Sequence, residues 1–168
     1  MRSLRGTTAL LTCFLLTAAP SRAASDCQPI YDAYAAMFQK PAVKRTITTP
    51  GMAAPVEMVL TPDAIYSRIG AKDSWGKVEL DAATRSVMRT GTPSPETVTE
   101  CRRIGPSESE GVTATAYEFT PATMSGNAPG EKITVVLDDT TGLPLSETAL
   151  KAGTKVTNVY DGVTIPSQ

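Results

Sequence analysis

Beyond residue 42 the chain is built from nine short runs in which apolar and polar residues alternate. Within Lys132–Asp138, Ile133, Val135 and Leu137 recur at every second position, a period that places one apolar row on one face of a β-strand. Prolines and glycines punctuate the runs, and strands at this short spacing predict an antiparallel meander. The runs are Val43–Thr48, Val56–Thr61, Ala64–Ile69, Trp75–Leu80, Thr97–Ile104, Val112–Thr120, Lys132–Asp138, Leu145–Leu150 and Lys155–Tyr160.

The turn after the seventh run carries the clearest local signal. The sequence DDTTG at residues 138–142 combines short polar side chains, which hydrogen-bond the local backbone, with Gly142, which adopts a positive φ without steric cost. Pro144 cannot donate to a ladder, so the returning strand is expected to begin at an edge or after a bulge. A calcium loop would need a different ligand spacing and a distal glutamate, so a solvated hairpin turn is the preferred interpretation.

Asp26–Lys40 is the stretch with a helical period. Its apolar side chains recur at i, i+4, i+7 and i+8, one stripe that we expect to lie against the sheet. They are Ile30, Tyr34, Met37 and Phe38. Asp26 is the expected N-cap, Pro29 would lie in the first turn, and Pro41 ends the helix. The segment 81–96 fits no strand and leaves room for a second, short helix. The predicted fold is α+β: a curved antiparallel sheet, an open half-barrel, wrapped around the amino-terminal amphipathic helix.

Residues 1–23 have the features of a secretory signal peptide. Arg2 and Arg5 precede the apolar run Ala9–Ala19, and a small-residue site predicts cleavage after Ala23. The run is far shorter than the roughly 20 residues that span a bilayer, so no stable membrane insertion is expected. Without a twin-arginine pair the general secretory route is favoured, and with it a periplasmic location. Residues 24–168 would then form a single domain.

The charge balance of the predicted mature chain argues against a nucleic-acid partner. Thirteen basic residues face seventeen acidic ones once the leader is removed, a net charge of about −4. Such a chain has no electrostatic attraction for a nucleic-acid backbone or an anionic lipid surface.

Two cysteines, Cys27 and Cys101, remain in this exported chain. An even pair in an oxidising compartment predicts one disulfide, which would join the start of the helix to a central strand. Two free thiols are the alternative. Neither cysteine lies in a CxxC motif, and the charged Asp26 before Cys27 argues against lipidation there.

The sequence offers little for catalysis. Histidine is absent, so the commonest general base and transition-metal ligand are missing. Residues 74–77 match S-x-x-K, but the partner motifs of penicillin-recognising enzymes are missing. Glu108 and Glu110 lie in Pro106–Gly111, which we interpret as a solvated loop. We therefore expect no enzyme, no cofactor and no metal; an enzyme would need strongly perturbed carboxylates in one pocket.

The remaining indication of a function comes from the apolar residues. Several runs carry apolar residues on both faces, and one helix does not necessarily fill a broad concave sheet, so some of these residues are candidates for lining a cavity. The alternative is that all of them fill the core. The candidates are Met58, Leu60, Tyr66, Trp75, Tyr117, Phe119, Val135 and Leu137.

Two segments resemble a known family. DDTTGLPL at Asp138–Leu145 resembles the hairpin of proteins similar to LolA, the periplasmic lipoprotein carrier, and of mycobacterial lipid-binding proteins related to LppX. VTNVYDGVTIP at Val156–Pro166 is similar to their last strand, and the order of leader, helix and meander with the early Trp75 also agrees. The resemblance implies an open half-barrel whose hydrophobic cavity shields a lipid or acyl chain. It also implies an arginine that locks the lid, for which Arg45 is the candidate.

The sequence thus predicts a periplasmic protein that binds a hydrophobic small molecule or acyl chain without performing chemistry. The rival hypothesis is an envelope protein-interaction module with the same fold and a filled core. In that case an exposed terminal strand at Lys155–Tyr160 would pair with a protein partner by strand addition.

Overall fold

The structure of the chain is a computed structural model, and it describes residues 22–122 and 130–167. The predicted signal peptide lies almost wholly outside the described residues, so its cleavage stays a prediction. None of the helices within the described ranges is both long and apolar enough to cross a membrane. The elements are α1 (Arg22–Met37), β1 (Val43–Thr48), β2 (Val56–Leu60), β3 (Ala64–Ile69), β4 (Gly76–Glu79), α2 (Ala82–Thr90), β5 (Val98–Ser109), β6 (Val112–Pro121), β7 (Ile133–Asp138), β8 (Pro144–Ala149) and β9 (Lys155–Val159).

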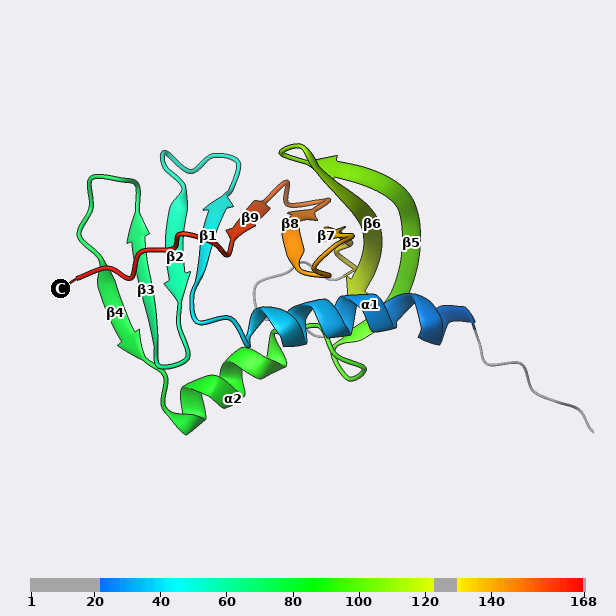
Figure 1. Ribbon diagram of the computed structural model, residues 1–168, viewed down its shortest axis with the longest axis horizontal. Coiled ribbons are helices and arrows are strands. Elements are labelled where there is room, and N and C mark those ends of the chain that lie inside the picture. Colours follow the sequence, from blue (N-terminus) through cyan, green and yellow to red (C-terminus); the bar gives the residue numbers. More distant parts are fainter. Residues whose placement is uncertain (1–21, 123–129, 168) are drawn as a thin grey trace, which may run out of the picture.

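The nine strands of the described chain form one antiparallel sheet that curls without closing (Figure 1). Two meanders, β1 to β4 and β5 to β9, meet where β1 pairs with β9, and β4 and β5 are the free edges. This confirms the α+β open half-barrel. The expectation of an exposed terminal strand is wrong, because β9 pairs with β1 on one side and β8 on the other.

Helix α1 lies across the β5–β8 part of the sheet and buries its apolar stripe there (Figure 1). Ile30, Tyr34 and Met37 are each at most 4% exposed, and they pack with Phe119 and Val135 of the sheet. Each large side chain buried in this way stabilises the fold by about 1.5–3 kcal/mol. The predicted stripe is confirmed except at its end, since Phe38 follows the helix and is 40% exposed.

The start of α1 differs from the sequence prediction. The helix already includes Arg22, so Asp26 is not its N-cap and Pro29 lies inside it. The amino-terminal half of the helix is joined to β5 by the predicted disulfide between Cys27 and Cys101, whose Cα atoms are 5.1 Å apart. This bond crosses 74 residues of sequence and should restrict the unfolded chain by roughly 4 kcal/mol in the entropic model.

The structure of residues 81–111 differs from one prediction and makes another more definite. Pro106–Gly111 is not a loop, because β5 continues to Ser109 after a register shift at Gly105, and Pro106 pairs with Thr115. Segment 81–96 does contain a helix, α2, whose N-cap is Asp81. Its carboxylate accepts a hydrogen bond from the Thr84 N–H at 2.7 Å.

The turn between β7 and β8 forms as its sequence predicts. The Asp138 carboxylate accepts hydrogen bonds from the N–H groups of Thr140 and Thr141, and Gly142 has a φ of 71°. Partial burial would raise the pKa of Asp138, but these hydrogen bonds outweigh it and hold that pKa below its usual range. Strand β8 begins at Pro144, and the register shifts directly after it, because Pro144 pairs with Leu137 and Ser146 with Val136.

A buried carboxylate fixes the entry to β7. Glu131 is 1% exposed and accepts hydrogen bonds from the N–H groups of Lys132, Lys151 and Ala152, at 3.2, 2.7 and 3.2 Å. These bonds tie the start of β7 to the turn between β8 and β9. Because hydrogen bonds to a charged group are stronger than neutral ones, the charge of Glu131 contributes to stability.

We expect Glu131→Gln to lower the free energy of unfolding by about 2 kcal/mol, because a neutral amide replaces a carboxylate that accepts three hydrogen bonds. Urea unfolding followed by circular dichroism measures this loss. Glu108→Gln, at an exposed position of β5, is the matched control and should change stability by less than about 0.5 kcal/mol. Equal effects of the two substitutions would contradict the role assigned to Glu131.

Candidate functional site

The pairing register shows which residues share the concave, inner face of the sheet. Opposed residues of an antiparallel pair lie on the same face, and Val135, buried under α1, defines the inner one. Val135 pairs with Glu147, and the register continues through β9 to Arg45 of β1 and then to Met58 of β2. The inner face therefore continues unbroken from the half covered by α1 to the half formed by β1–β4.

A hollow of about 240 Å³ lies on this face, between the carboxyl ends of both helices and the sheet. We call it the inner hollow. Most of its wall is apolar, with Met37, Met58 and Met88 contributed by α1, β2 and α2, and methionine side chains adapt readily to different shapes. The remaining lining residues are Tyr34, Phe38, Arg45, Leu60, Ile65, Gly91, Thr92, Pro93, Phe119, Ile133 and Glu147.

Two charged side chains form the polar part of the inner hollow. Arg45 donates from Nη2 to Glu147 Oε1 at 2.6 Å and from Nε to Asn158 Oδ1 at 3.1 Å. Both charged side chains are less than a fifth exposed. Arg45 of β1 thus connects to β8 and β9, across the joint between the two meanders, and not to a helix as the predicted lid lock would.

Two tyrosines adjoin this ion pair. Burial, and then the negative charge of Glu147, raise the pKa of the Tyr34 hydroxyl well above its usual value, so it stays protonated. The Glu147 carboxylate is a hydrogen-bond acceptor beside that hydroxyl, whose oxygen is buried. Burial also raises the pKa of Tyr160, whose hydroxyl donates to the Pro144 carbonyl at 2.6 Å.

The eight apolar residues predicted to line a cavity are not brought together. Met58, Leu60 and Phe119 line the inner hollow, whereas Tyr117 and Leu137 line a separate space of about 300 Å³ beside Pro29 and Ala33 of α1. Val135 is fully buried in the core beneath α1. Tyr66 and Trp75 line spaces on the opposite side of the sheet.

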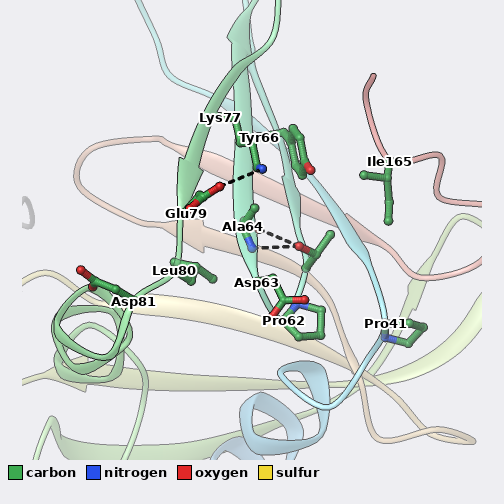
Figure 2. A pocket seen from close by; sticks show the side chains of 11 residues that line it. Pro41, Pro62, Asp63, Ala64, Tyr66, Lys77, Glu79, Leu80, Asp81 and Ile165 are labelled. Atoms are coloured by element: carbon green, nitrogen blue, oxygen red, sulfur yellow. Dashed lines mark hydrogen bonds and ion pairs between the residues drawn. The ribbon is translucent and has the colours of Figure 1, made fainter. Parts of the chain in front are cut away.

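A larger space, about 610 Å³, is a trough of mixed polar and apolar lining on the outer face of β3 and β4 (Figure 2). It includes Tyr66, and on its β4 side Lys77 forms an ion pair with Glu79 of the same strand at 3.2 Å. The pKa of Asp81 is lowered there by the backbone N–H of Thr84, which is the helix cap already described. Its lining combines charged side chains with apolar ones such as Leu80 and Ile165.

Trp75 belongs to the outer face as well. Its ring lies 4.5 Å from Arg68, which also pairs with Glu57, and the carboxyl-terminal segment 161–166 passes over the same region (Figure 1). Lys44, and then Arg68, hold the pKa of Glu57 below its usual value although burial opposes them. The outer face of β1–β4 therefore carries an ion-pair network, whereas the inner face of these strands is mainly apolar.

Sequence reasoning missed Tyr34, Arg45, Ile65 and Glu147 as lining residues. One signal was present: Arg45 stands between Val43 and Ile47 in the same row of β1, so a charge interrupts an apolar row. Within the described ranges no group of three or more acidic or cysteine side chains is placed to hold a metal ion.

A curled, unclosed antiparallel sheet with a helix across one half and an apolar hollow beside that helix defines a class of half-barrel protein. Lipoprotein LppX of Mycobacterium tuberculosis is 14% identical, with a TM-score of 0.55 over 85% of this chain and 99% of LppX. LprF of Mycobacterium bovis is 12% identical, with a TM-score of 0.53 over 86% of this chain and 97% of LprF. The chain thus has the fold of LppX and LprF, which confirms the predicted half-barrel.

The MucA/MucB complex of Pseudomonas aeruginosa contains a chain of the same fold, 16% identical, with a TM-score of 0.53. The match covers 84% of this chain but only 59% of that one. No protein-family model and no curated protein matches the sequence.

We expect Arg45→Met to lower the free energy of unfolding by about 3 kcal/mol, because it leaves the Glu147 carboxylate without its cation in a mostly buried position. The double variant Arg45→Met/Glu147→Leu should recover most of this loss, since no uncompensated charge then remains. Urea unfolding of both single variants and the double variant gives the coupling energy. Additive losses would show that the pair is not coupled.

Proposed function

We propose that the protein is a periplasmic carrier that binds the apolar chain of a lipid or lipoprotein on the inner face of its half-barrel, without performing chemistry. The observation that carries this proposal is an aliphatic surface that continues from the inner hollow along β1–β4. By register it consists of two cross-strand rows, which together we call the inner band: Ile65 and Val78 beside the hollow, and Ile47, Val56 and Ile69 on the far side of Ser67 and Gly76.

The inner band is partly open to solvent. Ile69 and Val78 are each 55% exposed, while Ile65, the partner of Val78 in the ladder, also lines the inner hollow. Single exposed aliphatic residues are common on proteins, but neighbours on adjacent strands of one face indicate an interaction surface. The matching positions of the outer face carry Glu57, Arg68 and Lys77, so the apolar character belongs to the inner face.

The volume of the inner hollow limits the size of the ligand that it can hold. Its volume of about 240 Å³ is below the roughly 300–1,000 Å³ of typical small-molecule pockets, so the hollow suits one end of an acyl chain. The rest of the chain would lie along the inner band. The three methionines of the hollow allow it to widen when the ligand enters.

The predicted periplasmic location agrees with this proposal. The predicted leader directs export, and the Cys27–Cys101 disulfide suits an oxidising environment. LppX is described as a lipoprotein, and the hairpin of this chain resembles those of lipid carriers. A net charge of about −4 for the predicted mature chain favours release from anionic membrane surfaces once a chain is bound.

We expect the protein recovered from the envelope fraction to release lipid on organic extraction. The stripped protein should bind diphenylhexatriene, an uncharged apolar dye that fluoresces in apolar surroundings. Ile69→Arg/Val78→Arg should weaken dye binding about fivefold or more, because two charges replace apolar contact surface. Dye fluorescence is the suitable readout, since Trp75 lies on the outer face.

Val159→Arg is the matched control for this test. Val159 is 47% exposed, close to the exposure of Val78, but its partner in the ladder is Lys44 on the outer face. The control should therefore bind the dye like the unaltered protein. A lipid-free protein whose dye binding is unaffected by the inner-face substitutions would refute the carrier function.

A protein-interaction module is the second candidate function. The fold also occurs in the MucA/MucB complex, and the free edge strand β5 extends over Val98–Ser109 with most of its side chains exposed. Its unpaired backbone groups could take an added strand from a partner. The site of strand addition is thus β5 and not Lys155–Tyr160.

If β5 receives a partner strand, adding an envelope protein extract should slow hydrogen exchange of its outward-facing amides. Strand β3, paired on both sides, is the internal control and should not change. Unchanged exchange along β5 would argue against strand addition.

A further inference from the structure

Strand β4 is a free edge of the sheet, at the end opposite to β5 (Figure 1). It pairs with β3 on one side, and on its other side no strand of the described chain follows. All four of its residues, Gly76–Glu79, are exposed. The backbone N–H and C=O groups along such an edge are a template for one more strand. A further strand added here would extend the sheet.

The side chains of β4 alternate between a charged row and an apolar one. Lys77 and Glu79 lie on the outer face, where their charges are 3.2 Å apart and the side chain of Glu79 is 82% exposed. Val78 lies on the inner face opposite Ile65 of β3, and it is 55% exposed. The edge therefore presents a cation, an aliphatic side chain and an anion in that order, with opposite charges on the two sides of Val78.

This order of charges makes the edge complementary to an identical edge. Two copies of one strand pair antiparallel about a twofold axis normal to the sheet, so residues of the same face lie opposite each other. With the axis at Val78, Lys77 of each copy lies opposite Glu79 of the other, and the two valines meet on the inner face. With the axis at Lys77 or Glu79, two like charges would lie directly opposite, which is destabilising. Charge complementarity thus favours the register centred on Val78.

We propose that the protein forms a symmetric dimer in which β4 pairs antiparallel with β4 of a second copy, centred on Val78. A lysine on a short edge strand commonly prevents pairing with other chains. In an identical strand each lysine meets a carboxylate, so that protection does not act against a second copy. The inference does not rest on the carrier function, because the pairing needs no ligand.

The second copy would also enlarge the apolar inner face. Opposed residues share a face, so the row formed by Ile65 and Val78 would continue into Val78 and Ile65 of the second copy. One four-residue strand from each copy buries less than the roughly 1,200 Å² of a standard interface, so the dimer should be weak. We expect a dissociation constant on the order of 100 µM at low ionic strength.

Sedimentation equilibrium of the protein, from about 5 to about 500 µM, measures this association. Lys77→Glu and Glu79→Lys should each weaken self-association about tenfold or more, because each places like charges opposite at both crossings. An equimolar mixture of the two variants should associate like the original protein, since one copy then has two carboxylates and the other two lysines at the facing positions. The double variant Lys77→Glu/Glu79→Lys should also self-associate.

Lys155→Glu is the matched control. It changes the net charge as Lys77→Glu does, at an exposed position of β9, a strand that is paired on both sides. This variant should self-associate like the original protein. Association of the mixed variants also shows that both of them are folded.

Three results would overturn the proposal: no self-association up to about 500 µM, undiminished self-association of Lys77→Glu or Glu79→Lys alone, or no association when these two variants are mixed. Diphenylhexatriene binding, measured on the same samples, reports separately on the carrier function. A protein that binds the dye as a monomer would refute the dimer and leave the carrier function in place.

Discussion

The mismatch between one helix and a nine-stranded sheet governs this structure. An α-helix with its side chains is about 10 Å across and neighbouring strands lie about 4.8 Å apart, so one helix covers two to three strands. Helix α1 accordingly packs on β5, β7 and β8, where a disulfide also holds it. The inner face of β1–β4 must be covered by something else or stay open. Met88 of α2 reaches the core, but Ile69 and Val78 remain more than half exposed.

The joint between the two meanders is the second determinant. Strand β9 returns to the middle of the sheet, and there Arg45, Glu147 and Asn158 connect three neighbouring strands through their side chains. A charged pair on a mostly buried face is a costly way to stabilise a sheet, because both ions lose water. The same pair gives an otherwise apolar hollow one polar end, next to the buried hydroxyl of Tyr34.

The two candidate functions use different parts of the molecule. A lipid chain would occupy the inner face, which the curl of the sheet shelters, whereas a partner strand would add to the β5 edge. The same fold occurs in lipoprotein LppX and in a chain of the MucA/MucB complex. The outer face suits neither role, because ion pairs, Trp75 and the carboxyl-terminal segment cover much of it.

The sequence by itself determined the elements: the alternating runs, the apolar stripe of α1, the hairpin turn at Asp138–Gly142 and the pairing of the two cysteines are local or compositional signals. Only the tertiary structure decided which side of each strand faces inward. Strands β2 and β3 carry apolar residues on both faces, so Tyr66 could not be told from Ile65 by period alone. The position of β9 and the pairing of Glu147 with Arg45 were equally undetermined. Each depends on strand pairing between residues a hundred positions apart, and a period of two within one strand holds no information about its neighbours.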